Sequence, residues 1–297
     1  MRSRPVPAVL ILLAALAAGG CRAPEAVTFG VVADCQFAAV PSSGSRFYDR
    51  SWLKLREALD GFNARDLRFV VHLGDLIDRD SASYDLILPA FRHSRAPVRF
   101  VLGNHDYDIA PARKDGLIDR LGIGPGYYAF TEENWRFVVL NGDELAFNSP
   151  KDEGLEQEAA AMYAGLLAAK RPHATKWNGG IGRAQMAFLE DELATADRKG
   201  LSVVILCHFP VHPPAAHNLW NDGEVVARLE SHPSVKAYFA GHNHDGGLAV
   251  KNGIVYLTFA GMVETAATSA SAVVTLAGDR LLVDGSGREP DRILALR

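Results

Sequence analysis

The sequence predicts an α/β fold in which strands and helices alternate and pack in layers. Three observations indicate this class. Apolar runs rich in β-branched residues recur along the chain, amphipathic segments lie between them, and nearly every apolar run ends in a carboxylate, amide or imidazole side chain. Alternation of strands and helices favours layered α/β architectures. The 297 residues, 48% of them hydrophobic, suffice for one large core or two small ones.

The amino-terminal half supplies the first strands and a helix. Residues 27–33, VTFGVVA, form an apolar run that predicts a strand. Residues 49–63 carry Trp52, Leu55, Leu59 and Phe62 at helical spacing, which predicts an amphipathic helix. Three further apolar runs predict strands at 68–73, 98–102 and 136–140.

The carboxyl-terminal half continues the alternation. Residues 183–195 place Met186, Leu189 and Leu193 on one face of a predicted helix. Apolar runs predict strands at 201–206, 235–240 and 253–260, and residues 271–285 predict a hairpin that turns at Gly278 and Asp279. Residues 150–182 contain a predicted helix and a polar loop, which we interpret as an insertion that covers the candidate functional site at the strand ends described below.

Residues 1–20 are interpreted as an export signal of the lipoprotein type. Arg2 and Arg4 precede an apolar stretch, residues 8–18, that is shorter than the roughly 20 residues needed to span a bilayer. The stretch ends in AAGGC, which resembles a bacterial lipobox and predicts lipid attachment at Cys21. An ordinary cleaved signal and an uncleaved anchor are the alternatives. We expect an exported cell-envelope lipoprotein that meets the membrane only through this anchor, with residues 21–26 as a linker and 27–297 as one domain.

Charge and cysteine content restrict the partners. The formal net charge is −4 and no basic stripe is present, so a nucleic-acid partner is not expected. An acidic balance still permits an anionic substrate, because bound metal ions reverse the local field.

Cys35 and Cys207 adjoin Asp34 and His208, and neighbours in a strand face opposite sides, so both thiols are expected in the core. The sequence leaves open whether they pair. A monomer is expected.

Five predicted strands end in side chains that suit metal binding. These are Asp34 and Gln36 in ADCQ, Asp75 and Asp78 in GDLID, Asn104, His105 and Asp106 in GNHDYD, His208 in CHFPVHPP, and His242 and His244 in AGHNH. In open α/β sheets, ligands bind outside the carboxyl ends of strands. A lone aspartate after a strand is usually a turn former or a helix cap. Five such ends in one chain instead predict a single polar crevice.

The order D-x-Q, GD-x-x-D, GNHD, H, GHNH resembles the calcineurin-like metallophosphoesterases. Most members of that superfamily carry histidine where this chain has Gln36. A subgroup with glutamine there is the manganese-dependent ADP-ribose/CDP-alcohol diphosphatases. The segments FGVVADCQFA, WNGGIGRAQMAFLEDEL, AGHNHDGG, VETA and GREPDRI also resemble that subgroup, so the likeness covers nearly all of residues 29–297.

The resemblance implies a four-layer sandwich of two mixed β-sheets flanked by helices, with a dinuclear metal site at the carboxyl ends of the strands. It assigns Asp34, Gln36, Asp75 and His244 to one metal ion, and Asp75, Asn104, His208 and His242 to the other. Two divalent ions are implied, with Mn²⁺ favoured and Fe, Zn or Mg as alternatives. No thiolate is offered, which agrees with hard or borderline cations. Paired cations clamp the attacking and leaving oxygens of a phosphoryl displacement.

Two further residues are predicted to act in catalysis. His105 is expected to protonate the leaving group or to stabilise charge in the transition state, and Asp106 to orient its neighbours. Gln36 has an alternative role, a hydrogen bond to a metal-bound water or to the substrate. Phe37, Tyr107, Asn178 and Trp220 are candidates for contacting a base or ribose, with packing at the rim as the alternative.

The resemblance implies a hydrolase of the diphosphate linkage in small nucleotide derivatives such as ADP-ribose and CDP-choline. One alternative is a phosphomonoesterase or cyclic-nucleotide phosphodiesterase that uses the same metal site. Another is a non-enzymatic envelope lipoprotein that binds metal or nucleotide.

Overall fold

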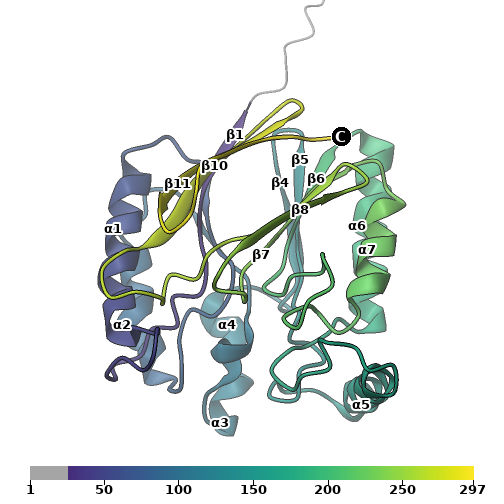
Figure 1. Ribbon diagram of the computed structural model, residues 1–297, viewed down its shortest axis with the longest axis horizontal. Coiled ribbons are helices and arrows are strands. Elements are labelled where there is room, and N and C mark those ends of the chain that lie inside the picture. The colour runs from purple at the N-terminus through teal and green to yellow at the C-terminus, as the bar shows by residue number, and fades with distance from the viewer. Residues whose placement is uncertain (1–25) are drawn as a thin grey trace, which may run out of the picture.

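A computed structural model describes residues 26–297. The elements form four layers in the order helix, sheet, sheet, helix (Figure 1). The predicted export signal, residues 1–20, and the predicted lipid attachment at Cys21 lie outside the described residues. Within residues 26–297, no helix combines the length and the apolar character that a membrane crossing requires.

The first sheet joins the two ends of the described chain. Its strands are β12 (Arg292–Ala295), β11 (Arg280–Gly287), β10 (Ala270–Ala277), β1 (Val27–Val32), β2 (Val70–His72) and β3 (Val98–Phe100), in that order. Strands β1, β2 and β3 run parallel, and β10 pairs antiparallel with β1. The carboxyl-terminal strands therefore complete the sheet that the amino-terminal strand begins.

The second sheet has the same mixed character. Its strands are β4 (Tyr128–Glu132), β5 (Trp135–Val139), β6 (Ser202–Leu206), β7 (Val235–Ala240), β9 (Ile254–Thr258) and β8 (Gly247–Lys251), in that order. Strands β5, β6, β7 and β9 are parallel, and the two edge strands are antiparallel to their neighbours. Two mixed sheets flanked by helices confirm the predicted fold class.

Helices cover both outer faces and one end of the sandwich. Helices α1 (Ser51–Asn63) and α2 (Ala82–Phe91) flank the first sheet, and α6 (Arg183–Lys199) and α7 (Asp222–Glu230) flank the second (Figure 1). Helices α3 (Pro111–Lys114), α4 (Leu117–Leu121) and α5 (Glu153–Ala168) lie at the lower end in Figure 1. Short 3₁₀ helices occupy η1 (Tyr48–Arg50) and η2 (Asn104–Tyr107).

Burial on both faces explains why the central strands read as continuous apolar runs. In β1, Val27, Phe29 and Val31 point into the core between the two sheets, whereas Val32 packs in the layer under α1 and α2. The Phe29 ring meets the ring of Phe137 of β5 edge-on, with the ring centroids 5.4 Å apart. This contact fastens one sheet to the other.

Most predicted elements are present with shifted ends. The helix predicted over residues 183–195 continues to Lys199 and stops at Gly200, which has a φ of 65° and so ends the helix in the left-handed conformation. The predicted hairpin is confirmed, because Ala277 pairs with Arg280 across a two-residue turn. Sequence reasoning missed β4, β8 and β12, which are short strands at the sheet edges with no fully buried residue.

The prediction of two core cysteines is confirmed. Cys35 and Cys207 are both fully buried, and both are free thiols, so they do not pair. The Cys35 Sγ atom lies 3.4 Å from the sulfur of Met262. Burial raises the pKa of the Cys207 thiol to about 11, which agrees with an inert core role.

Candidate metal centre

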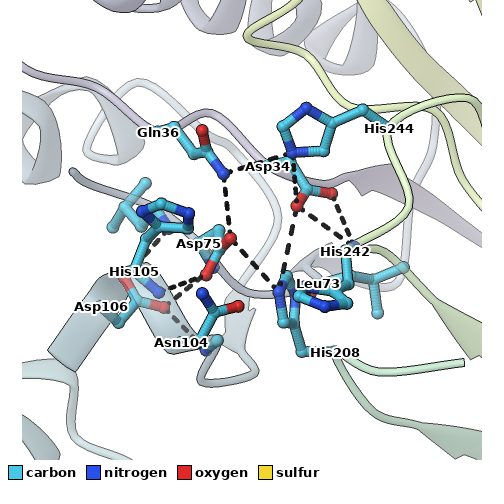
Figure 2. A network of polar contacts seen from close by, with 12 residues as sticks. Asp34, Gln36, Leu73, Asp75, Asn104, His105, Asp106, His208, His242 and His244 are labelled. Carbon is cyan, nitrogen blue, oxygen red and sulfur yellow. Dashed lines mark hydrogen bonds and ion pairs between the residues drawn. The ribbon is translucent and has the colours of Figure 1, made fainter. Parts of the chain in front are cut away.

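The loops after five strands converge on one place, as Figure 2 shows. The seven predicted metal ligands come from these loops: Asp34 and Gln36 after β1, Asp75 after β2, Asn104 after β3, His208 after β6, and His242 and His244 after β7. Both sheets contribute, so the site lies where their carboxyl ends meet. Asp34, Asp75 and His208 have no solvent exposure.

An uncommon backbone conformation aims several of these side chains. Asp34, Gln36, Asp75 and His242 have positive φ angles of 51°, 41°, 58° and 64°. Non-glycine residues rarely occupy the left-handed region, and such strain persists where the surrounding structure enforces it. Strands β1, β2 and β7 thus end in sharp turns that direct their last polar side chains into the shared crevice.

Two glycines let the backbone pass directly beside the carboxylates. A Cβ atom on Gly103 would lie 2.3 Å from Oδ1 of Asp75, and one on Gly241 would lie 2.7 Å from Oδ2 of Asp34. Neither distance leaves room for a side chain. These contacts explain why glycine precedes Asn104 and His242 in the two motifs.

Asp75 lies at the middle of the constellation. Its Oδ2 atom is 3.1 Å from Nε2 of Gln36 and 3.3 Å from Nε2 of His208. Its Oδ1 atom accepts a hydrogen bond of 2.8 Å from the backbone N–H of His105. One carboxylate oxygen therefore faces members of both predicted ligand sets, which is the position that a residue shared by two cations requires.

The first ligand set closes around Asp34 and His244. Nε2 of His244 is 3.4 Å from Oδ1 of Asp34 and 3.2 Å from Nε2 of Gln36. A half-turn about the last side-chain bond of Gln36 exchanges its nitrogen and its oxygen. The carbonyl oxygen can therefore reach the position between Asp75 and His244.

The second set contains a compact group of ligand atoms. One ligand atom each from Asp75, His208 and His242 lies within 4.8 Å of the others. The side-chain oxygen of Asn104 is buried beside them without a hydrogen-bond partner. This group is a candidate metal site on geometry alone.

A hydrogen bond fixes one ring nitrogen of each histidine and leaves the other for a metal. Nδ1–H of His208 donates to the backbone carbonyl of Leu73 over 2.8 Å, which leaves Nε2 free. Nε2–H of His242 donates to Oδ1 of Asn178 over 2.9 Å, which leaves Nδ1 free. Such partners orient metal-binding imidazoles and set their tautomers.

The third imidazole has a carboxylate partner. Nδ1 of His244 lies 2.7 Å from Oε1 of Glu264, which leaves Nε2 for the first ligand set. Arg288 holds the same loop, because it donates to the backbone carbonyls of His244 over 3.1 Å and of Gly261 over 2.9 Å.

Unpaired buried atoms show that the site fits cations. Oε1 of Gln36, Oδ1 of Asn104 and Nε2 of His208 are buried and have no hydrogen-bond partner. Each such group left unpaired costs about 1–3 kcal/mol. Oδ1 of Asn104 and Nε2 of His208 lie at the same centre, and Oε1 of Gln36 joins them after the half-turn described above, so divalent cations would satisfy all three.

The electrostatics agree with this fit. Burial lowers the pKa of His208, but the carboxylates of Asp75 and Asp34 outweigh it and raise the value to about 10. Burial likewise opposes charge on His244, yet Asp34 and Glu264 raise its pKa to about 9. The buried carboxylates thus draw positive charge into the site, and metal binding would replace these protons with cations.

His105 reaches the crevice without belonging to either ligand set. Its side chain is 21% exposed, and Nδ1 lies 3.4 Å from Oδ1 of Asp78. Burial lowers the pKa of His105, but Asp75 and Asp78 outweigh it and raise the value above its usual range. A partly exposed imidazole with a raised pKa at the edge of the site suits the role of a proton donor.

Asp106 is a positioning residue in the structure, because it is buried and saturated with hydrogen bonds. Its carboxylate accepts from the backbone N–H groups of Asp75, Leu76 and Gly103 at 2.9–3.0 Å, and from the Tyr84 hydroxyl at 2.8 Å. It therefore ties the loop after β2 to the loop after β3. The predicted orienting role has a geometric basis here.

The four residues predicted to contact substrate are all buried. Phe37 is 7% exposed, Tyr107 1%, Asn178 0% and Trp220 1%. Asn178 binds His242, and Nε1–H of Trp220 donates to the backbone carbonyl of Thr175 over 3.0 Å. These contacts correspond to packing, the alternative that the sequence left open. Direct contact of these four with substrate stays a prediction.

Sequence reasoning missed Glu264 and the role of Asn178. Each holds a predicted ligand histidine in place from a distant segment. For Glu264 the available signal was the segment VETA, an acidic residue shortly after a central strand. Asn178 carried no signal for this role, because nothing in a sequence links residue 178 to residue 242.

Comparison with known proteins agrees with the site. The calcineurin-like phosphoesterase family matches residues 27–246, and the chain belongs to this family. It is therefore a hydrolase of the metallophosphoesterase class.

Two curated relatives and one solved structure match most of the chain. The human manganese-dependent ADP-ribose/CDP-alcohol diphosphatase is 29% identical over 314 residues, covering 90% of this chain and 92% of its own. The rice protein of the same name is 30% identical, covering 89% and 92%. A crystal structure of a dimetal phosphatase from Danio rerio superposes with a TM-score of 0.82 at 27% identity, covering 91% of this chain and 99% of that one.

Proposed function

We propose that this protein hydrolyses the diphosphate linkage of nucleotide derivatives such as ADP-ribose and CDP-alcohols, and that Mn²⁺ supports the reaction. The observation that carries the proposal is the likeness to diphosphatases of that name along about nine-tenths of the chain. Gln36 supports it locally, because an amide oxygen in place of an imidazole suits harder cations such as Mn²⁺ and Mg²⁺.

Seven side chains would hold two divalent cations. Asp34, Gln36, Asp75 and His244 would bind one, and Asp75, Asn104, His208 and His242 the other. Bound cations polarise phosphoryl oxygens and lower the pKa of bound water. The hydrogen bonds from Leu73, Asn178 and Glu264 hold the imidazoles ready for this task.

His105 has the position of the proton donor. It lies beside Asp75 at the exposed edge of the site, and Asp75 and Asp78 raise its pKa above the usual range. A proton given to the leaving phosphate oxygen avoids the build-up of negative charge there. Asp106 fixes the backbone on either side of Asp75 and so maintains the distance between His105 and the ligands.

A substrate panel tests the proposal. The purified full-length chain, kept in detergent, is assayed with ADP-ribose, CDP-choline, p-nitrophenyl phosphate and a cyclic nucleotide across a series of free Mn²⁺ concentrations. We expect a higher kcat/KM for the two diphosphates and no turnover after chelation. A preference for p-nitrophenyl phosphate or for the cyclic nucleotide would replace the proposal with one of the two alternatives on the same metal site.

A non-enzymatic binding role has no support. Such a protein would be expected to have lost at least one ligand, yet every predicted ligand position carries a suitable side chain. The relatives that match most of the chain are named as enzymes.

We also propose that the chain is exported and anchored to the cell envelope through a lipid on Cys21. The support is the basic start, the short apolar stretch and the lipobox-like AAGGC. Membrane fractionation of wild type and Cys21→Ser tests it. The substituted protein should leave the membrane fraction, and an unchanged distribution would exclude the lipid anchor.

A further inference from the structure

A pocket of about 380 Å³ opens directly beside the metal centre. Its inner wall contains Asn104 and His105, one a predicted ligand and the other the proposed proton donor. Its outer wall contains Phe147, Asn148, Lys176 and Trp177, which lie on the segments before and after α5, with Asp108 at the edge. Of these outer residues only Trp177 belongs to a segment quoted for the family resemblance, WNGGIGRAQMAFLEDEL, and none was predicted to contact substrate.

The outer wall is unusual in its exposed aromatic rings. Phe147 is 45% exposed and Trp177 is 52% exposed. Of the eight large hydrophobic side chains exposed among residues 26–297, these two alone are aromatic, and both line this pocket. Scattered exposed aliphatic residues need no explanation, but aromatic rings gathered at a reaction site indicate a binding surface.

Phe147 is held in place from behind. Its ring meets Tyr163 of α5 edge-on at 5.0 Å and lies 5.2 Å from the ring of buried Trp220. A ring fixed on one side and open on the other pays little conformational entropy when a flat group stacks on it.

The pocket is joined to the reaction site by a hydrogen bond. Nδ2 of Asn148 donates to the backbone carbonyl of Asn104 over 2.9 Å. Lys114 in turn donates to the backbone carbonyl of Asn148. A group in the pocket therefore lies next to His105, and exposed Lys176 adds a cation that suits a phosphorylated ligand.

We propose that this pocket binds the nucleobase of the substrate by stacking against Phe147 and Trp177, which leaves the diphosphate at His105 and the metal centre. Aromatic walls suit the π-face of any base, and this stacking is tolerant of base identity. The inference rests on the proposed function and names the residues that recognise its substrate class. It also explains how one site could accept both adenine and cytosine derivatives.

Equilibrium binding of AMP and ribose 5-phosphate isolates the base, because the two ligands share the phosphate and the ribose. Both are titrated into the Mn²⁺-loaded protein by calorimetry. We expect AMP to bind about tenfold more tightly, the lower part of the range for one stacked base. Phe147→Ala and Trp177→Ala should each remove most of this difference. Leu167→Ala, an exposed position on α5 outside the pocket, should keep it.

Tryptophan fluorescence gives a second readout. Trp177 is exposed, whereas Trp135 and Trp220 are each 1% exposed and Trp52 is partly buried on α1 and does not line the pocket. A base stacked on Trp177 should therefore quench mainly that residue. AMP should quench the emission and ribose 5-phosphate should not. Trp177→Phe should abolish the quenching but keep most of the preference for AMP, since phenylalanine still stacks.

Two outcomes would overturn the pocket assignment. These are equal affinity of wild type for AMP and ribose 5-phosphate, and an unchanged preference for AMP in both alanine variants. Neither measurement requires turnover. Cleavage of ADP-ribose without any dependence on the base would therefore remove this inference and leave the proposed function intact. A base-dependent affinity without diphosphate cleavage would support the pocket assignment and remove the proposed function.

Discussion

The floor of the metal centre and the rim pocket beside it differ in how they hold their side chains. On the floor, Asp34, Asp75 and His208 are completely buried. On the rim, Phe147 and Trp177 expose about half of their surface. The floor is made from strand ends of both sheets, and the rim from the segments around α5.

This contrast separates reactivity from recognition. Cations need donor atoms at fixed positions, and only buried, hydrogen-bonded groups on strand ends supply such precision. Recognition tolerates more variation, and loops carried by a rigid scaffold commonly provide it. We therefore expect substitutions on the floor to affect turnover and metal binding strongly. Substitutions of residues that connect the floor to the rim should have smaller effects.

The largest effect is expected for His105→Ala. Turnover should fall by about 10²–10⁴-fold, the usual contribution of a general acid, while both metal ions stay bound. Kinetics and elemental analysis of the same preparation measure the two quantities. His93→Ala, at an exposed histidine, is the matched control. Loss of metal from the His105 variant would make His105 a ligand and place it on the floor.

The next effect concerns the carboxylate behind His244. Glu264→Ala removes the partner of Nδ1 and should weaken the affinity of the first metal site by about 10–100-fold. Glu264→Gln keeps an acceptor for that N–H and should recover part of the affinity. Calorimetric titration with Mn²⁺ measures both, with Glu57→Gln on the exposed face of α1 as control. Equal affinity in wild type and Glu264→Ala would show that His244 needs no such partner.

Gln36→His should change metal preference more than it changes stability. An imidazole in place of the amide should lower the Mn²⁺ concentration needed for half-maximal activity by about tenfold and shift preference towards Zn or Fe. The measurement is the activity of wild type and Gln36→His as a function of free Mn²⁺ and of free Zn²⁺ concentration. Identical metal dependence would leave Gln36 in its alternative role, a hydrogen bond to water or substrate.

The smallest effect is expected where the rim is joined to the floor. Asn148→Ala removes the hydrogen bond to the Asn104 carbonyl, and a net loss of about 0.5–1.5 kcal/mol corresponds to a 2–10-fold fall in kcat/KM. Asn63→Ala breaks a similar amide-to-carbonyl bond of 2.7 Å on the exposed surface and serves as control. The same kcat/KM in wild type and Asn148→Ala would show that floor and rim act independently.

The sequence predicted the floor well because strand ends follow local rules. A buried apolar run followed by Gly and Asp, or by Gly, Asn and His, marks both the strand and the polar turn after it. Parallel strands bring such ends to one edge, so Asp75, Asn104 and His208 could be expected together before any contact was known. Their individual roles as ligands stay predictions.

The side chains of the rim could not be predicted from the sequence by the same rules. The residues chosen as substrate contacts adjoin motifs in the sequence, yet Tyr107 and Trp220 are buried, and Trp220 packs against the ring of Phe147. Phe147 and Trp177 belong to segments without regular structure, where no periodicity reports which way a side chain faces. Tertiary packing alone decides that Phe147 points outward with Trp220 behind it.

The pairing of β1 with β10 has a consequence for when the molecule becomes functional. A chain made from its amino terminus produces Asp34 and Gln36 early, but β1 gains its second neighbour only after β10 has been synthesised. Arg288, which holds the His244 loop, emerges later still. Nascent or truncated chains therefore lack a complete site. If the chain is exported as proposed and crosses the membrane before it folds, the compartment outside would supply the ions.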